Sequence, residues 1–295
     1  MTVLTETGRD CAIGMGTTRV LHPLRLDEGA TGEGAGRGSY VGVAIDTETT
    51  GLDWRTGKVI ELALRRFRYD EDGVITDIDR AYEWREDPGE PLTAEVSALT
   101  GLTDIDLVGQ EIDTDAAVRL LRSASFVVAH NSAFDRPWLE KRLPDARDLP
   151  WVCSMSQIDW RGRGFDGRVL GYLLVQNGFY HCGHRASADV DALIQMIRHR
   201  DAVDRTALAE LIATGSKPGW IVRARGAHFD VKDALRARGY RWDAADDRKV
   251  WWREVADDRL VQEQFWLAAN VYAADAQPTA ICPDLVRVTP QTRFA

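Results

Sequence analysis

The fold is decided by Val41-Gly42-Val43-Ala44-Ile45-Asp46-Thr47-Glu48, a short apolar run that ends in acidic residues. A run of this kind predicts a buried strand. Successive side chains on a strand point to opposite faces, so Asp46 and Glu48 leave this strand on one side. Two unpaired carboxylates about 4 Å apart repel by roughly 1–4 kcal/mol near a protein surface, and a divalent cation between them removes that repulsion. Such hard oxygen ligands suit Mg²⁺ or Mn²⁺. The alternative is a strand end that turns into solvent, where acidic residues are common.

Another acidic residue follows the apolar run at 125–129, which also predicts a buried strand. The chain continues as His130-Asn131-Ser132-Ala133-Phe134-Asp135, and a helix is predicted from Ala133 to about Arg142. Asp135 falls in the first turn of that helix, where a carboxylate offsets the helix dipole by about 0.3–1 kcal/mol. If Asn131 or Ser132 caps the helix instead, Asp135 is left to face the strand ends.

The last acidic segment is His184-Arg185-Ala186-Ser187-Ala188-Asp189, which precedes a helical pattern over 187–200. In a functional interpretation Asp189 is a metal ligand and His184 is a base that titrates near pH 7. The alternative is an exposed loop histidine beside an ordinary N-terminal helix acid. The cluster His181-Cys182-Gly183-His184 offers three zinc ligands but no obvious fourth, which disfavours a zinc site.

The remaining periodicity predicts an α/β domain. Strands are expected at 59–69 and 74–84, joined by a turn at 70–73, and at 151–155. With the two buried runs they make five strands, and helical patterns alternate with the later ones. Three strands followed by alternating helices and strands predict a mixed five-stranded sheet flanked by helices.

The acidic segments together resemble the DEDDh 3′–5′ exonucleases, a family that includes the epsilon proofreading subunit of bacterial replicases. The Asp-x-Glu motif followed by Thr-Gly is present as Asp46-Thr47-Glu48-Thr49-Thr50-Gly51. The His-Asn-x-x-Phe-Asp motif is present as residues 130–135, and the His-x-Ala-x-x-Asp motif as residues 184–189. The resemblance covers about residues 40–200, and Leu99-Thr100-Gly101-Leu102-Thr103 is similar to a short segment between the first two motifs.

This resemblance implies a ribonuclease H-like fold, two divalent cations (Mg²⁺ or Mn²⁺) and hydrolysis of a nucleic acid at its free 3′ end. It implies that Asp46 bridges both cations, that Glu48 and Asp189 complete one cation site, and that Asp135 serves the other. It further implies that His184 deprotonates the attacking water. The residues expected to line the pocket for the terminal nucleotide are Thr49, Leu52 and Phe134.

Several functions are compatible with this scheme. The leading expectation is a DNA exonuclease that releases nucleoside monophosphates. The alternatives are an RNA-trimming enzyme of the same fold, because 2′-hydroxyl recognition depends on pocket shape, and a non-catalytic nucleic-acid-binding scaffold. A proofreading role would require a polymerase or clamp partner, since 295 residues leave no room for a polymerase.

The predicted domain organisation has four parts. Residues 1–39 contain eight glycines and no aromatic residue, which predicts a flexible tail. The exonuclease domain is expected at 40–214 and a linker at 215–219, followed by a small α+β module at 220–295 with a C-terminal helix and tail. Within that helix Gln262-Glu263-Gln264-Phe265-Trp266 is similar to a sliding-clamp peptide, although an amphipathic packing face is the favoured interpretation.

The C-terminal module has its own charge and composition. Residues 220–255 hold nine basic and six acidic residues, against a net charge of −9 for the whole chain. Basic residues interleaved with aromatic rings suit a strand-binding surface, where each stacked base contributes about 1–3 kcal/mol. The alternative is that most of the rings form the core, because a small module needs large side chains to bury enough area.

Bulk properties exclude some classes of protein. The net charge of −9 opposes nonspecific nucleic-acid binding. No stretch reaches the roughly 18 consecutive apolar residues of a membrane span, and the first thirty residues hold no signal core. None of the four cysteines forms a C-x-x-C pair. A cytoplasmic protein with no membrane contact is expected.

Overall fold

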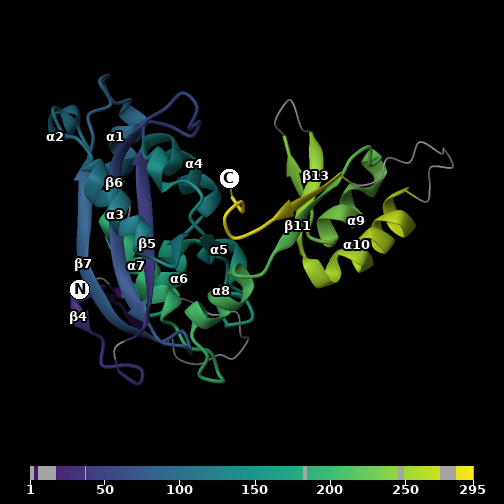
Figure 1. Cartoon of the computed structure of the whole chain (residues 1–295), viewed down its shortest axis with the longest axis horizontal. Coiled ribbons are helices and arrows are strands. Elements are labelled where there is room, and N and C mark those ends of the chain that lie inside the picture. Colours follow the sequence, from purple (N-terminus) through teal and green to yellow (C-terminus); the bar gives the residue numbers. More distant parts are fainter. Residues whose placement is uncertain are drawn as a thin grey trace. The chain divides into compact units, whose positions relative to one another are not determined.

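The computed structural model describes residues 3–5, 18–36, 38–181, 185–244, 249–272 and 284–294. The chain divides into two compact units (Figure 1). The N-terminal unit comprises Met1–Gly215 with Phe294–Ala295, and the C-terminal unit comprises Ser216–Arg293. Among the described residues, no helix has both the length and the apolar character needed to span a bilayer.

A six-stranded mixed sheet forms the centre of the N-terminal unit. Its strand order is β4-β7-β6-β5-β8-β9. The strands are β4 (Gly29–Ala30), β5 (Tyr40–Thr49), β6 (Val59–Tyr69), β7 (Ile75–Arg85), β8 (Phe126–Ala129) and β9 (Trp151–Cys153). β5, β6 and β7 pair antiparallel, whereas β8 and β9 run parallel to β5. The α/β prediction is confirmed, and the strand that it missed is the two-residue β4.

Helices cover both faces of this sheet. The longer ones are α3 (Thr114–Arg122), α4 (Ser132–Arg142), α6 (Leu170–Gln176), α7 (Ala186–Ile197) and α8 (Ala207–Gly215). The shorter ones are α1 (Ala94–Thr100), α2 (Asp104–Leu107) and α5 (Ser154–Gln157). One apolar cluster joins Ala44 to α6, α7 and α8, and another joins Val43 and Ile45 to α3 and α4. Because both faces of β5 are buried, its sequence is a continuous apolar run rather than an alternating one.

The segment before β5 differs from the expected flexible tail. β4 pairs antiparallel with β7, and β3 (His22–Pro23) pairs parallel with β10 (Phe179–Tyr180). Leu21 is buried, and Leu24 and Leu26 pack against the core. The average composition of residues 1–39 is dominated by glycine and suggests too little apolar surface for order, but these three leucines bury enough of it to hold the segment against the core. The short strands β1 (Val3–Thr5) and β2 (Thr18–Val20) also pair, while residues 1–2, 6–17 and 37 lie outside the described residues.

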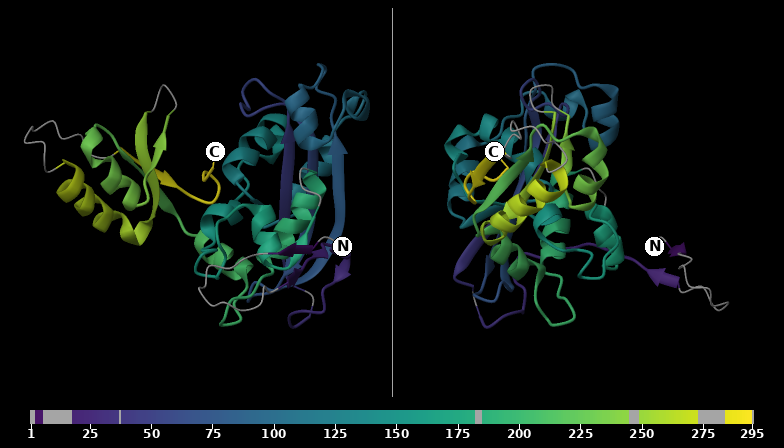
Figure 2. Two further views of the ribbon diagram at one scale, coloured as in Figure 1. Left: turned by 180° about the vertical axis from the view of Figure 1, so that it is seen from behind. Right: turned by 90° about the vertical axis from the view of Figure 1, so that its right-hand side faces the viewer.

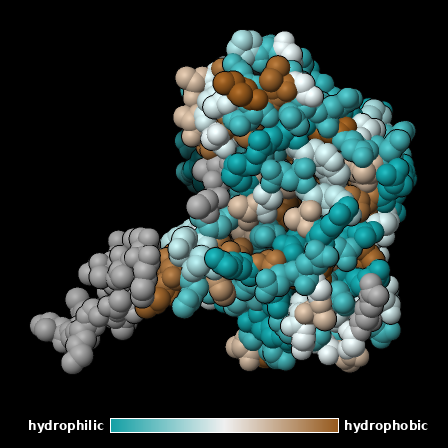
Figure 3. Space-filling model, turned by 90° about the vertical axis from the view of Figure 1, so that its left-hand side faces the viewer, coloured by the Kyte–Doolittle hydropathy of each residue, from teal (hydrophilic) through white to brown (hydrophobic). Residues whose placement is uncertain are grey.

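The surface seen in Figure 3 is largely hydrophilic, with an apolar patch at its top. In Figure 1, α1 and α2 lie at the top of the N-terminal unit. Three apolar side chains of this region are exposed, namely Leu99, Ile105 and Val108.

The C-terminal unit is a four-stranded antiparallel sheet with helices on one face (Figures 1 and 2). Its strand order is β12-β13-β11-β14. The elements are β11 (Gly219–Ala224), α9 (Lys232–Ala237), β12 (Arg241–Asp243), β13 (Val250–Ala256), α10 (Leu260–Leu267) and β14 (Asp284–Val288). A π-helical turn at Ala268–Tyr272 extends α10.

The aromatic rings of residues 220–255 divide between core and surface, so the interpretation that most of them form the core holds only in part, and Phe229 is 71% exposed. Tyr240 is buried, and Trp220, Trp251 and Trp266 pack against the same cluster, whereas Trp242 is 49% exposed. The segment similar to a clamp peptide lies in α10, with Glu263 buried and Trp266 packed on the core. The other three residues of the segment are exposed, namely Gln262, Gln264 and Phe265, and Phe265 is 73% exposed.

Candidate active site

The first two acids lie where β5 extends past its parallel neighbour. β8 pairs with β5 only from Gly42 to Ala44, whereas β6 pairs with it from Tyr40 to Thr49. Asp46 and Glu48 therefore lie beyond the end of β8, on one side of the strand because they are two residues apart. This leaves room beside them for the helices that follow in the chain.

Asp189 joins this pair from the first turn of α7, which packs against β5 and β6. One carboxylate oxygen from each of Asp46, Glu48 and Asp189 lies within 4.8 Å of the others. The first and third motifs are thus brought together in space over a separation of about 140 residues. All three donors are hard oxygen ligands at metal-ligand spacing, and they fit a divalent cation of the Mg²⁺ or Mn²⁺ type.

Asp135 approaches the same place from α4. Its Oδ1 accepts hydrogen bonds from the Thr47 backbone N–H (3.1 Å) and from the Thr47 hydroxyl (2.9 Å). The side chain is almost fully buried, at 3% exposed. Asn131, at the N-cap position, has a φ of +99° and makes no side-chain capping bond. Asp135 is thus held against Thr47 of β5 rather than exposed to solvent, and it is not one of the three acids whose oxygens lie within 4.8 Å of one another.

These acids strongly perturb one another. Burial, and then the charge of Asp135, raise the pKa of Asp46 well above its usual value. Burial, followed by Asp189 and Glu61, raises the pKa of Glu48 to about 7. Burial likewise raises the pKa of Asp135 to about 7, against the two hydrogen bonds from Thr47. Carboxylates held together in this way bind either protons or a cation.

Behind the acids lies a buried ion-pair network that the sequence analysis missed. Glu61 of β6 is directly opposite Glu48 and fully buried. Its carboxylate accepts from Arg185 Nη2 at 3.0 Å and from the Ala186 backbone N–H at 3.0 Å. Ala186 is the first residue of α7, so Glu61 fixes the start of the helix that carries Asp189. The available signal was a lone acid inside the apolar run 59–64, since a buried charge requires a partner.

A histidine does contact the cluster, but it is His181. Its Nε2 lies 2.7 Å from Asp189 Oδ1. The predicted base His184 lies outside the described residues, as do Cys182 and Gly183 of the histidine–cysteine cluster. His181 thus holds the Asp189 carboxylate from the loop before α7.

His130 of the second motif has a structural position. Its Nε2 lies 2.8 Å from the Arg168 carbonyl, which can only accept, so Nε2 carries the proton. Its Nδ1 then accepts from the Ser154 hydroxyl at 2.7 Å. Burial lowers the pKa of His130 to about 4, so the ring is neutral at physiological pH and ties the end of β8 to α5.

The three predicted pocket residues have different surroundings. Leu52 is 89% exposed and lines a cavity of about 410 Å³ between the loop after β5 and the segment 90–93. The Thr49 hydroxyl donates to the Gly51 carbonyl (2.7 Å), and the Phe134 ring packs 5.9 Å from the Trp138 ring. Leu52 belongs to the lining of this cavity, and Thr49 and Phe134 do not.

Comparison with known proteins agrees with this geometry. A model of the Exonuclease family (RNase_T) matches residues 43–197, more than half of the chain. The chain therefore belongs to the Exonuclease family, and its fold and acidic motifs are those of a DEDD-type 3′–5′ exonuclease.

Individual relatives are similar over parts of their length. The chain is 39% identical over 100 residues to DNA polymerase III PolC-type of Halalkalibacterium halodurans, covering 33% of this chain and 6% of that protein. It is 28% identical over 118 residues to ribonuclease T of Shewanella oneidensis, covering 35% of this chain and 53% of that protein. The chain thus matches about half the length of ribonuclease T and a small part of PolC.

A solved structure shares the fold. E. coli Exonuclease I, in complex with a dA16 oligonucleotide, has a TM-score of 0.50 at 15% identity, covering 81% of this chain and 75% of that chain. At this identity the likeness concerns the fold alone.

Proposed function

We propose that this chain is a divalent-cation-dependent exonuclease that releases nucleoside monophosphates from the 3′ ends of DNA. The observation that carries the proposal is the approach of Asp46, Glu48 and Asp189 to within 4.8 Å of one another at the end of β5. Such a cluster costs stability when it is empty, and the rest of the fold holds it in place. Family membership supports the hydrolysis of a nucleic acid.

The four acids divide between two proposed cation sites. Asp46, Glu48 and Asp189 would hold one Mg²⁺ or Mn²⁺ ion, and Asp46 with Asp135 would hold a second. When bound, the pair would activate a water molecule and stabilise negative charge on the attacking and leaving oxygens of the phosphodiester. Thr47 fixes the Asp135 carboxylate, and His181 fixes that of Asp189.

His184 is the proposed base that accepts the proton of the attacking water, since imidazole titrates near pH 7. Thr49, Leu52 and Phe134 are the proposed contacts of the terminal nucleotide. The exposed Leu52 at the mouth of a cavity supports this assignment.

DNA is the proposed substrate because the similarity to a PolC-type DNA polymerase has the higher identity, 39% over 100 residues. A polymerase partner would follow from that similarity. The second candidate is RNA trimming, which the similarity to ribonuclease T supports.

The proposal is tested with DNA and RNA strands that carry a 5′ label, incubated with Mg²⁺, Mn²⁺ or chelator. The expected result is a ladder that shortens from the 3′ end only in the presence of a cation, and more slowly on RNA. The matched control is Asp46→Asn, which should give no ladder. Equal turnover by this variant, or turnover in chelator, would overturn the proposal, and faster turnover of RNA would favour the second candidate.

A further inference from the structure

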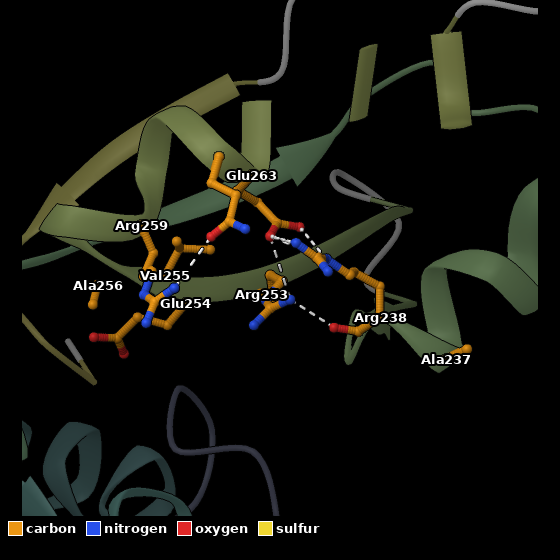
Figure 4. Close-up of a pocket in the computed structure, with 9 residues that line it drawn as sticks. Ala237, Arg238, Arg253, Glu254, Val255, Ala256, Arg259 and Glu263 are labelled. Atoms are coloured by element: carbon orange, nitrogen blue, oxygen red, sulfur yellow. Dashed lines mark hydrogen bonds and ion pairs between the residues drawn. The ribbon is translucent and has the colours of Figure 1, made fainter. Parts of the chain in front are cut away.

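A polar cavity of about 600 Å³ opens in the C-terminal unit, whereas the four acids of the active site belong to the N-terminal unit. It lies between the end of α9, strand β13 and the start of α10 (Figure 4). Its volume is within the roughly 300–1,000 Å³ range of small-ligand sites. Three arginines line it, namely Arg238, Arg253 and Arg259.

The cavity lining carries more positive than negative charge. Its acids are Glu254 and Glu263. Glu254 is already engaged by Arg293, whose Nε donates to it at 2.8 Å. Figure 4 shows Arg238 and Arg253 both meeting Glu263, which is 3% exposed. One carboxylate therefore faces two guanidinium groups, and Arg259 adds a third.

The arginines are preorganised rather than mobile. The Arg238 guanidinium lies 5.0 Å from the Trp266 ring centroid, and that of Arg253 lies 5.8 Å from the Tyr240 ring centroid. Arg253 Nη1 also donates to the Arg238 carbonyl at 2.6 Å. Stacking and hydrogen bonding fix both side chains before any ligand arrives, which lowers the entropy cost of binding.

Arg253 and Arg259 have N–H groups that are available to a ligand. A guanidinium has five N–H groups. Within the part of the chain that the structure describes, the hydrogen bonds of Arg253 use Nη1, and that of Arg259 uses Nη1, to Gln262 at 3.3 Å. The remaining nitrogens of these two arginines have no hydrogen-bond partner among the described residues. An anion with several acceptor oxygens matches such a surface, and phosphate does so in a bidentate manner.

We propose that this cavity is a phosphodiester-binding site, in which Arg253 and Arg259, supported by Arg238, hold a backbone phosphate of the nucleic-acid strand. The proposal rests on the proposed exonuclease function for the identity of the strand. The site contacts the phosphate backbone and not the bases, so it raises the affinity for the strand without selecting a base sequence.

The test measures strand binding by the full chain in chelator, where hydrolysis is suppressed. The probes are a fluorescein-labelled 20-mer of thymidylate and an abasic strand of the same length, titrated between 50 and 200 mM salt. Each lost phosphate contact lowers the slope of log affinity against log salt by about 0.7 for single strands. Arg259→Ala should lower the slope by about that amount and weaken binding of both strands several-fold.

Matched variants separate the site from general charge. Arg259→Lys keeps the charge and should retain the slope. Arg236→Ala removes an equal charge from a side chain that is 67% exposed, pairs with Asp233 and does not line the cavity, so it should leave the slope unchanged. An unchanged slope in Arg259→Ala, or an equal fall in Arg236→Ala, would overturn the proposal.

Competitors identify the ligand. Displacement of the abasic strand by inorganic phosphate, at an equal concentration of phosphate groups, would assign the cavity to a free anion and overturn the strand assignment. Equal binding of a polyglutamate peptide would likewise overturn it. Hydrolysis of thymidine 5′-p-nitrophenyl phosphate by the unaltered chain tests the proposed exonuclease function separately, because failure there leaves the salt-slope result intact.

Discussion

Replacing Asp46 by Asn should stabilise the cation-free protein. Asp46 lies among Glu48, Asp189 and Asp135, and each of them raises its pKa. The amide keeps the shape of the side chain and removes its charge. The change therefore isolates the repulsion that the fold tolerates at this position.

The size of the effect follows from the spacing of the acids. Ligand oxygens within 4.8 Å of one another interact, as unit charges, by about 1 kcal/mol in water and about 3 kcal/mol at an effective dielectric constant of 20. The raised pKa values mean that part of the charge is already neutralised by protons, which limits the sum. We expect the free energy of unfolding in chelator at pH 7.5 to rise by about 1–3 kcal/mol.

The stability difference between Asp46→Asn and the unaltered chain should also depend on pH. The folded-state pKa of Glu48 is raised from 4.5 to about 7, so the folded state binds the extra proton between these values. The destabilisation is therefore absent below pH 4.5 and complete above pH 7. The advantage of Asp46→Asn should grow across that window.

Urea unfolding in chelator, followed by circular dichroism at several pH values, measures both quantities. Addition of Mg²⁺ should reverse the order, because the unaltered chain gains binding energy that the variant largely loses. If Asp46→Asn is no more stable than the unaltered chain in chelator at pH 7.5, the acids do not repel as inferred, and the cation site loses its physical basis.

Three other substitutions test the groups around the acids. Glu61→Gln removes the buried one of the two acids that pair with Arg185, while Glu83 remains. It should lower the free energy of unfolding by about 1–3 kcal/mol, measured by urea unfolding, and an unchanged free energy would contradict the network. His181→Ala should weaken Mn²⁺ binding about 10–100-fold in calorimetric titration, as loss of a partner of a ligand does, and unchanged affinity would remove it from the site. Thr47→Val removes the hydrogen bond from the Thr47 hydroxyl to Asp135 and should lower the free energy of unfolding, measured in urea, by about 1.5–3 kcal/mol. Thr47→Ser keeps the hydroxyl and is the control that should retain the stability.

The central features of the site could be predicted because they depend on local periodicity. The alternation of a strand places Asp46 and Glu48 on one side, and the position of Asp189 in the first turn of a helix follows from the 187–200 pattern. The three motifs also predicted the family, and the match of the family model over residues 43–197 confirmed it. The roles of His184 and of the pocket residues remain predictions.

Other features depend on contacts between distant parts of the chain. Glu61 and Arg185 meet across 124 positions, and no periodic pattern within either segment encodes that pairing. Thr47 points to the opposite side of β5 from the acids, so its bond to Asp135 depends on how α4 packs. The leucines at 21, 24 and 26 were hidden by averaging composition over a glycine-rich stretch, although each buries apolar area in the fold.

The short β4 has a consequence for how the domain behaves when it is shortened. β7 spans Ile75–Arg85, and β4 covers only Asp77 and Ile78 of its outer side. A chain that began at Tyr40 would expose the backbone of β7 at Asp77 and Ile78. The charged side chains of Arg80 and Glu83 lie toward the other end of this edge strand. Uncovered backbone groups of this kind invite pairing with a second molecule. We therefore expect the segment before β5 to limit self-association through this sheet edge, and its removal to favour association between copies of the domain.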